Sequence, residues 1–203
     1  MIQRIVTLLV ALLCIGWSET VNPPAPPSIG PWTIGPVIGS ESLSPGMPIS
    51  MSAAPSGWYF DFPQSPNSVH YVTRAPTEAA RSGIRMSFEI SGNAEFKEAD
   101  CGGVGCVPGP GMVRLYIQRC GDDWRTTGFR FWSPPLQLSG GALQIDYALD
   151  PSWTGVYGTD PDGFRAALSN LCAVGFTFGG RFAAHGVYAT APARFVLTNF
   201  ELY

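Results

Sequence analysis

The chain has 203 residues, only 13% of them charged, and its formal net charge at pH 7 is −3. A chain of this length forms one domain with at most a tail, and its acidic balance provides no basic surface for nucleic acid or an anionic membrane. Its 24 glycines and 19 prolines interrupt helices and favour short strands joined by turns.

The first 18 residues have the pattern of a signal peptide. Arg4 precedes an apolar run from Ile5 to Ile15, and Gly16 and Ser18 are small residues where a signal peptidase cleaves. The run is short for a membrane span, although an N-terminal anchor is the alternative. We therefore expect a secreted protein, extracellular or periplasmic, with no integral membrane segment after cleavage.

Residues 19–56 are rich in Pro, Gly and Ser and show little periodicity. The run "VNPPAPPSIGP" is typical of an extended polyproline linker. Trp32, Ile34, Val37 and Ile38 are apolar enough to dock on a domain, so the segment is either a linker or a strap lying along it.

Residues 57–203 contain a series of strand patterns. "GWYFDF" and "VHYVT" come first, followed by "GIRMSFEIS", "MVRLYIQR", "GFRFWS", "ALQIDYAL", "CAVGFTFGG" and "ARFVLTNFELY". Several alternate strictly, with Ile84, Met86 and Phe88 on one face of their strand and Arg85 and Ser87 on the other. Strands with one apolar face each must pack as two sheets.

One segment, "TDPDGFRAALSNL", has helical periodicity. Asp160 is a suitable N-cap, Pro161 stands at the first helical position, and Phe164, Ala167 and Leu168 share one face. The expected fold is an all-β, two-sheet antiparallel jelly-roll β-sandwich with one short α-helix.

The cysteines that remain after removal of Cys14 are even in number, which favours disulfides in an exported chain. They are Cys101, Cys106, Cys120 and Cys172. Cys101 and Cys106 bracket a glycine-rich loop that can close on itself, which would leave Cys120 to pair with Cys172. A zinc site is disfavoured because there is no CxxC motif and both histidines lie elsewhere.

The succession "RFWS", "WTGVYG", "FRAALSNL", "VGFTFGG", "HGVYAT" and "ARFVLTNFEL" resembles a set of uncharacterised secreted bacterial proteins. More loosely, it is similar to jelly-roll carbohydrate-binding modules of the galactose-binding-domain-like type. The resemblance covers residues 57–203 and implies a fold and a glycan partner, but it transfers no individual binding residue. Some of those modules hold a structural calcium ion. No equivalent ligand set is evident in this sequence, so no cofactor is predicted, and a structural calcium ion is the alternative.

Outward positions on three strands carry the groups that a sugar site needs. Aromatic rings stack on the apolar face of a sugar, and planar polar groups hydrogen-bond its hydroxyls. If the strands are neighbours, the carbohydrate-binding residues are Arg114, Tyr116, Gln118, Arg130, Trp132, Gln144 and Asp146. The alternative is that this face is covered and Trp132 belongs to the core. The loop aromatics Trp124, Trp153 and Tyr157 form a second candidate platform.

No catalytic constellation is predicted. A polysaccharide-active hydrolase needs two carboxylates about 5–10 Å apart, and Glu89 and Asp146 are the one plausible pair. The serine-hydrolase motif GxSxG is absent, and His70 and His185 have no evident serine and aspartate partners.

The leading hypothesis is a secreted, non-catalytic domain that recognises an extracellular glycan. The alternative is a structural or adhesive surface protein that binds another protein or self-associates. A polysaccharide-active hydrolase or lyase is the third class.

Overall fold

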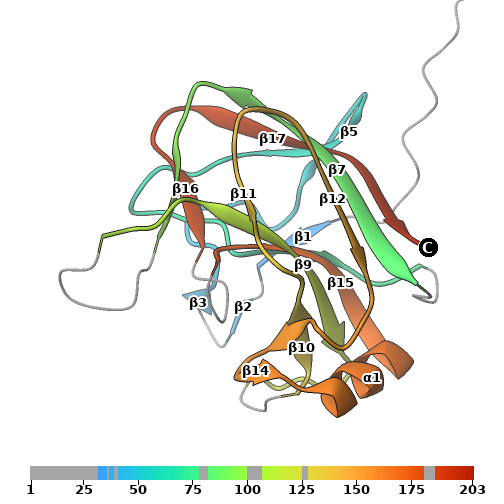
Figure 1. Cartoon of the computed structure of the whole chain (residues 1–203). Helices are drawn as coiled ribbons and strands as arrows, with labels where there is room; N and C mark the ends of the chain where they lie inside the picture. Colours follow the sequence, from blue (N-terminus) through green and yellow to red (C-terminus); the bar gives the residue numbers. More distant parts are fainter. Residues whose placement is uncertain are drawn as a thin grey trace, which may run out of the picture.

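The computed structural model of the chain describes residues 32–35, 37–38, 41–77, 82–99, 107–124, 128–180 and 186–203. They form two antiparallel β-sheets packed face to face, with one short helix at one end (Figure 1). The predicted fold class, a two-sheet antiparallel jelly-roll β-sandwich, is confirmed. The expected signal peptide, Cys101, Cys106 and His185 lie outside the described residues.

The larger sheet has the strand order β1-β6-β15-β9-β10-β13-β14, with β11 also paired to β9. Its strands are β1 (Thr33–Ile34), β6 (Tyr71–Arg74), β9 (Met112–Arg119), β10 (Arg130–Trp132), β11 (Leu136–Gln137), β13 (Thr154–Gly155), β14 (Gly158–Thr159) and β15 (Leu171–Phe178). A Cβ at Gly175 of β15 would collide with the carbonyl oxygen of Val72, so the close pairing of β15 with β6 requires glycine there.

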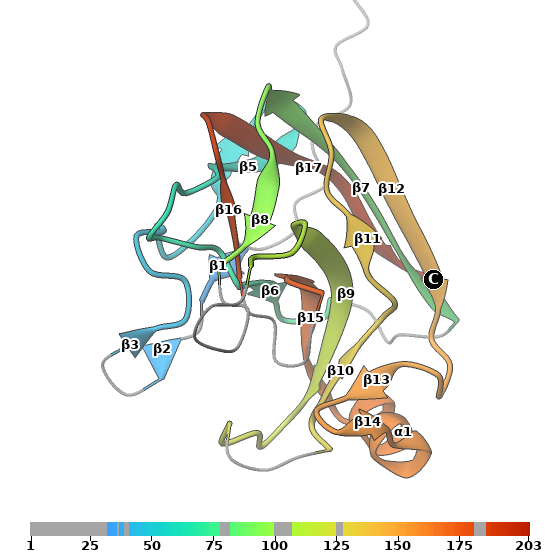
Figure 2. The same cartoon turned by 60° about the vertical axis from the view of Figure 1, so that its left-hand side comes forward.

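The smaller sheet has the strand order β12-β7-β17-β5-β4. Its strands are β4 (Ser52–Ala54), β5 (Gly57–Asp61), β7 (Gly83–Gly92), β12 (Gly141–Ala148) and β17 (Ala193–Leu202). Two further pairs are β8 (Phe96–Glu98) with β16 (Val187–Ala189), and β2 (Val37–Ile38) with β3 (Glu41–Ser42). Figure 2 shows β8 and β16 beside one another, away from α1.

Aromatic rings fill the space between the two sheets. The ring of Phe195 on β17 stacks on Phe60 and Phe88 within its own sheet, and across the sandwich on Phe176 of β15 at a centroid distance of 5.3 Å. Burial of such rings is the main source of stability in a sandwich core.

Part of the proline-rich segment belongs to this core. Trp32 has no exposed surface and lies between Phe176 of the larger sheet and Phe200 of the smaller one. Ile34 follows it in β1 and is also buried. The core of the sandwich therefore includes residues from the segment expected to be either a linker or a strap.

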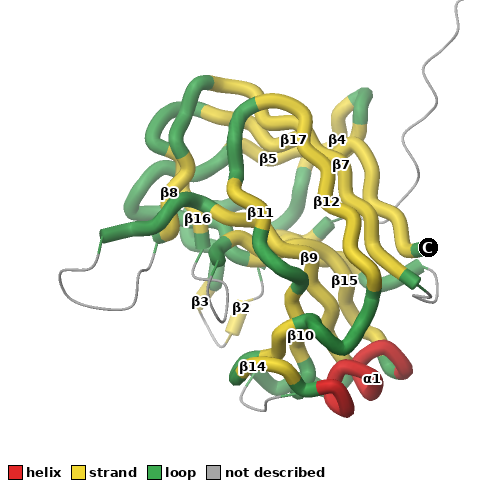
Figure 3. Tube along the Cα trace, viewed as in Figure 1, coloured by secondary structure: helices red, strands yellow, loops and turns green. Residues whose placement is uncertain are grey.

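The helix α1 (Pro161–Ser169) forms as the sequence predicts (Figure 3). The side chain of Asp160 accepts a hydrogen bond from the backbone N–H of Gly163 at 2.9 Å, and Pro161 begins the helix. Phe164 and Ala167 are buried against the end of the sandwich, where Phe164 meets Phe131 edge-on.

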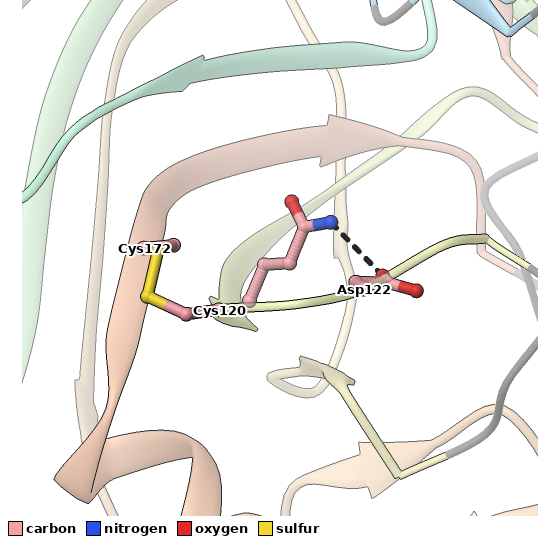
Figure 4. Close-up of a disulfide and its surroundings, with 4 residues drawn as sticks. Cys120, Asp122 and Cys172 are labelled. Carbon is pink, nitrogen blue, oxygen red and sulfur yellow. Dashed lines mark hydrogen bonds between the residues drawn. A yellow bond between two sulfur atoms is a disulfide. The ribbon is translucent and has the colours of Figure 1, made fainter.

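The predicted Cys120–Cys172 disulfide is present (Figure 4). It joins the residue that follows β9 to the second residue of β15, and these strands are neighbours in the larger sheet. The bond anchors the start of the loop that leads to β10.

Candidate functional site on the outward face of the larger sheet

The sequence-predicted site residues divide between the two sheets. Arg114, Tyr116 and Gln118 on β9 are paired with Arg130 and Trp132 on β10, as expected. Gln144 and Asp146 lie on β12, which belongs to the smaller sheet, so the prediction of one continuous surface was wrong. Alternation shows which way a side chain points but not which sheet its strand joins.

Strand register places the first group in rows across the outward face of the larger sheet. One row runs Tyr71, Thr177, Arg114. The next runs Gly175, Tyr116, Trp132, Thr154. Side chains opposite one another in such rows have Cβ atoms about 5 Å apart. We call this surface the aromatic face and define it by Tyr71, Arg114, Tyr116, Arg130, Trp132 and Thr177.

The centre of the aromatic face is buried, as in the alternative left open above, in which this face is covered and Trp132 belongs to the core; Trp132 and Tyr116 are therefore not the exposed residues of the sugar-site hypothesis. Trp132 is 1% exposed and Tyr116 is 0% exposed. Three residues from distant segments, Leu43, Trp124 and Val156, pack against this cluster from outside. The face thus forms a second, smaller core on the far side of the sheet.

Trp124 is the partly exposed ring of this cluster. Its φ of +66° lies in the left-handed region, which an aromatic residue seldom adopts. The backbone N–H of Trp124 donates a hydrogen bond to the carboxylate of Asp122 at 2.8 Å. Arg130 lies over the indole, with its guanidinium carbon 4.8 Å from the ring centroid. The ring meets Tyr71 edge-on at 5.4 Å.

A buried ion pair supports that arrangement. Arg130 Nε lies 3.0 Å from Asp122 Oδ2, and the Asp122 side chain is 1% exposed. Gln118 donates to the same carboxylate oxygen at 2.9 Å, the dashed contact in Figure 4. Gln118 and Arg130, predicted as ligand-binding residues, therefore position the loop that carries Trp124.

Arg114 is buried differently. Its Nε donates to the Ser133 carbonyl at 2.6 Å and its Nη2 donates to the Thr154 hydroxyl at 2.7 Å. Both acceptors are neutral, and within the described ranges no carboxylate forms an ion pair with Arg114. Burial lowers the pKa of Arg114 to about 10, so the guanidinium still carries its charge at neutral pH.

Apart from Arg130 Nε, which is held by its ion pair with Asp122, three buried polar atoms on the aromatic face have no hydrogen-bond partner among the described residues. They are the Tyr116 hydroxyl, the Trp132 indole nitrogen and the Thr177 hydroxyl. Burial raises the pKa of Tyr116 well above its ordinary value, so the phenol stays protonated and able to donate. Native proteins leave few buried polar groups unpaired, and those that remain often mark a ligand or water site.

The outward face of the smaller sheet is chemically different. We call it the charged face and define it by Asp61, Arg85, Asp146, Arg194 and Glu201. Asp146 accepts hydrogen bonds from Arg85 Nε at 2.8 Å and from the Tyr203 hydroxyl at 2.6 Å, and these lower its pKa. The Arg85–Asp146 and Arg194–Asp61 pairs are exposed to solvent. In each pair, the two side chains occupy much of each other's hydrogen-bonding capacity.

Glu89 and Asp146 do not form a catalytic pair. Glu89 is opposite Ala142 on β12, and Asp146 stands four residues further along that strand. At about 3.3 Å per residue the separation is roughly 13 Å, beyond the range of about 5–10 Å that glycosidic hydrolysis needs.

A groove of about 480 Å³ lies away from both faces, between β8 and the segment that joins β11 to β12. Its polar lining includes Glu95, Lys97 and Gln137, with Glu95 and Lys97 paired at 3.5 Å. The one aromatic residue in its lining, Phe96, is buried in the core. The described lining of the groove therefore offers no exposed ring on which a sugar can stack.

The other loop aromatics separate clearly. Trp153 is buried, and its indole N–H donates to the Ala148 carbonyl at 2.8 Å, so it is a core residue. Tyr157 is 85% exposed in the turn between β13 and β14.

The Nε2 atom of His70 lies 3.0 Å from the hydroxyl of Ser68.

In the part of the chain that the structure describes, no three His, Cys, Asp or Glu side chains gather as metal ligands would. The same residues contain no helix with the length and apolar character to cross a bilayer.

No protein-family model matches the chain, and no curated protein matches it. A solved structure described as the "xylan-binding module CBM15" is similar over 84% of this chain and 92% of its own, with 15% identity and a TM-score of 0.42. A likeness of this size transfers no ligand and no residue.

Proposed function

We propose that the protein is a secreted, non-catalytic domain that binds an extracellular glycan at the aromatic face. One observation carries the proposal: a partly exposed tryptophan, Trp124, is held in a costly backbone conformation over a cluster of aromatic and hydrogen-bonding side chains. Strained residues persist where the surrounding structure fixes them, and they concentrate at ligand sites. An indole beside polar groups is the combination that binds sugar rings.

The Asp122–Arg130 pair supports this role because it fixes the Trp124 loop without relying on exposed side chains. The Cys120–Cys172 disulfide anchors the same loop at its start and is compatible with an oxidising, extracellular location. The part of the indole not covered by Arg130 and Tyr71 is available for stacking.

A glycan array, followed by calorimetry on its hits, tests the proposal with protein purified from cells that express the full chain. We expect Trp124→Ala to weaken binding at least about tenfold, or roughly 1.4 kcal/mol. Tyr59→Ala on the smaller sheet is the matched control and should leave affinity unchanged. Silence on the whole array, or unchanged affinity of Trp124→Ala, contradicts the proposal. A stable oligomer that buries Trp124 would favour the adhesive alternative.

A further inference from the structure

The charge and hydrogen-bonding groups of the aromatic face are out of balance. Arg130 is paired with Asp122, whereas Arg114 is 6% exposed and, among the residues that the structure describes, bonds only to neutral oxygens. The exposed arginines of the charged face, Arg85 and Arg194, each have an aspartate partner. A buried cation without a counter-charge is unfavourable, so its presence on an acidic protein calls for an explanation.

The unpaired polar atoms around Arg114 can all donate. The indole nitrogen of Trp132 is a donor only, and the hydroxyls of Tyr116 and Thr177 can donate or accept. Thr177 is the register neighbour of Arg114, and Tyr116 is the register neighbour of Trp132 in the adjacent row. One cation and three donors on adjacent positions match a partner that is negative and rich in acceptors.

We propose that the glycan bound at this face contains an acidic sugar whose carboxylate pairs with Arg114. This inference rests on the proposed function. A single net positive charge matches one carboxylate. Nε and Nη2 of Arg114 already donate to Ser133 and Thr154, and Nη1, which has no polar contact among the described residues, is the nitrogen left to donate to that carboxylate. The neighbouring donors of Thr177, Tyr116 and Trp132 would bind the remaining acceptors of the same sugar, with Trp124 stacking at the rim.

Entry requires one covering residue to move, and Val156 is well placed to do so. It packs on the Tyr116–Trp132 cluster from the turn between β13 and β14, and this turn borders a hollow of about 100 Å³. Gly155 and Gly158 flank Val156 and Tyr157 in that turn, and Gly158 has a φ of +112°. Thr154, which bonds Arg114, is only two residues from Val156.

Matched polymers test the inference by calorimetry on the intact protein. Polygalacturonate, alginate and glucuronoxylan are each compared with the methyl-esterified form of the same polymer, which lacks the charge. We expect at least one of the three to bind, and its ester to bind at least about tenfold more weakly. Arg114→Met should reduce uronate binding to the level of the ester. Arg194→Met removes the same charge from the smaller sheet and should change neither affinity.

Each of the other possible outcomes contradicts a defined part of this inference or of the proposed function. Equal binding of a uronate and its ester, or binding of neutral glycans only, contradicts the carboxylate and leaves the proposed function standing. Silence from every glycan contradicts both. Equally tight, Arg114-dependent binding of dextran sulfate contradicts the choice of a carboxylate. If Arg114→Met does not fold, Thr177→Val replaces it, and unchanged uronate affinity in that variant contradicts the inference.

Discussion

The two outward faces of the sandwich start from the same strand pattern and end in different environments. On the charged face, alternating polar residues such as Asp61 and Arg194 are exposed and pair with one another. On the aromatic face, the equivalent positions hold Tyr116 and Trp132, which are buried beneath residues from distant loops. Alternation therefore decides which side of a strand a residue occupies, and the loops decide whether that side meets water.

The difference also separates two roles for polar groups. Paired charges on an exposed sheet face contribute little to folding. Buried polar groups without partners lower stability, and proteins retain such groups mainly at functional sites. The aromatic face is therefore the better candidate for ligand binding, although the charged face is more accessible.

The largest expected effect is the difference in stability loss between two aspartate–arginine pairs, one buried and one exposed. Asp122→Asn removes the carboxylate that pairs with the buried Arg130 guanidinium and should lower the free energy of unfolding by about 3 kcal/mol or more. Asp61→Asn breaks the exposed pair with Arg194 and should lower the free energy of unfolding by only about 0.5 kcal/mol or less. Urea denaturation of both variants measures the contrast. Equal losses would show that the two faces do not differ as described.

Sequence patterns predicted the strands and the helix because their signals are local. The alternation of Ile84, Met86 and Phe88 marked β7, and Asp160 with Pro161 marked the start of α1. The sequence could not assign β12 to the smaller sheet, because the pairing of Asp146 with Arg85 joins residues 61 positions apart.

The residues that cover the aromatic face could not be predicted from the sequence either. Leu43, Trp124 and Val156 lie far apart along the chain, and none marks itself as a partner of Trp132. The one available signal was Trp124 in the polar loop "GDDWR", which local pattern rules treat as a turn. Its left-handed backbone and the buried Asp122 beneath it appear only in three dimensions.

A smaller effect, opposite in sign, is expected at the Tyr116 hydroxyl. Tyr116→Phe removes a buried polar atom that has no partner and keeps the ring packed against Trp132. We expect the free energy of unfolding to rise by about 1 kcal/mol, because a buried unpaired polar group costs about 1–3 kcal/mol. The same variant should bind glycan more weakly if the hydroxyl contacts the ligand.

Tyr59→Phe on the smaller sheet is the control for this effect. Tyr59 carries the Arg194 guanidinium 4.2 Å from its ring centroid, and that contact does not need the hydroxyl. Its thermal midpoint should match that of the wild type. A loss of stability in Tyr116→Phe would show that a buried water satisfies the hydroxyl and would remove one of the unpaired donors from the argument.

The smallest expected effect is a difference between the two faces in how stability depends on pH. Hydrogen bonds from Arg194 to Asp61, and from Tyr203 and Arg85 to Asp146, hold the pKa of both carboxyls below the ordinary value of 3.8. Because the folded pKa is the lower one, the stabilisation is complete above the unfolded pKa and is lost as the pH falls through the folded pKa. The Asp61→Asn, Asp146→Asn double variant should therefore lose less thermal stability than the wild type between pH 5 and pH 2. Arg114, Tyr71 and Tyr116 titrate far above that range. These three groups therefore cannot supply the acid response that the double variant lacks. An unchanged pH profile in the double variant would show that the exposed pairs do not contribute to folding.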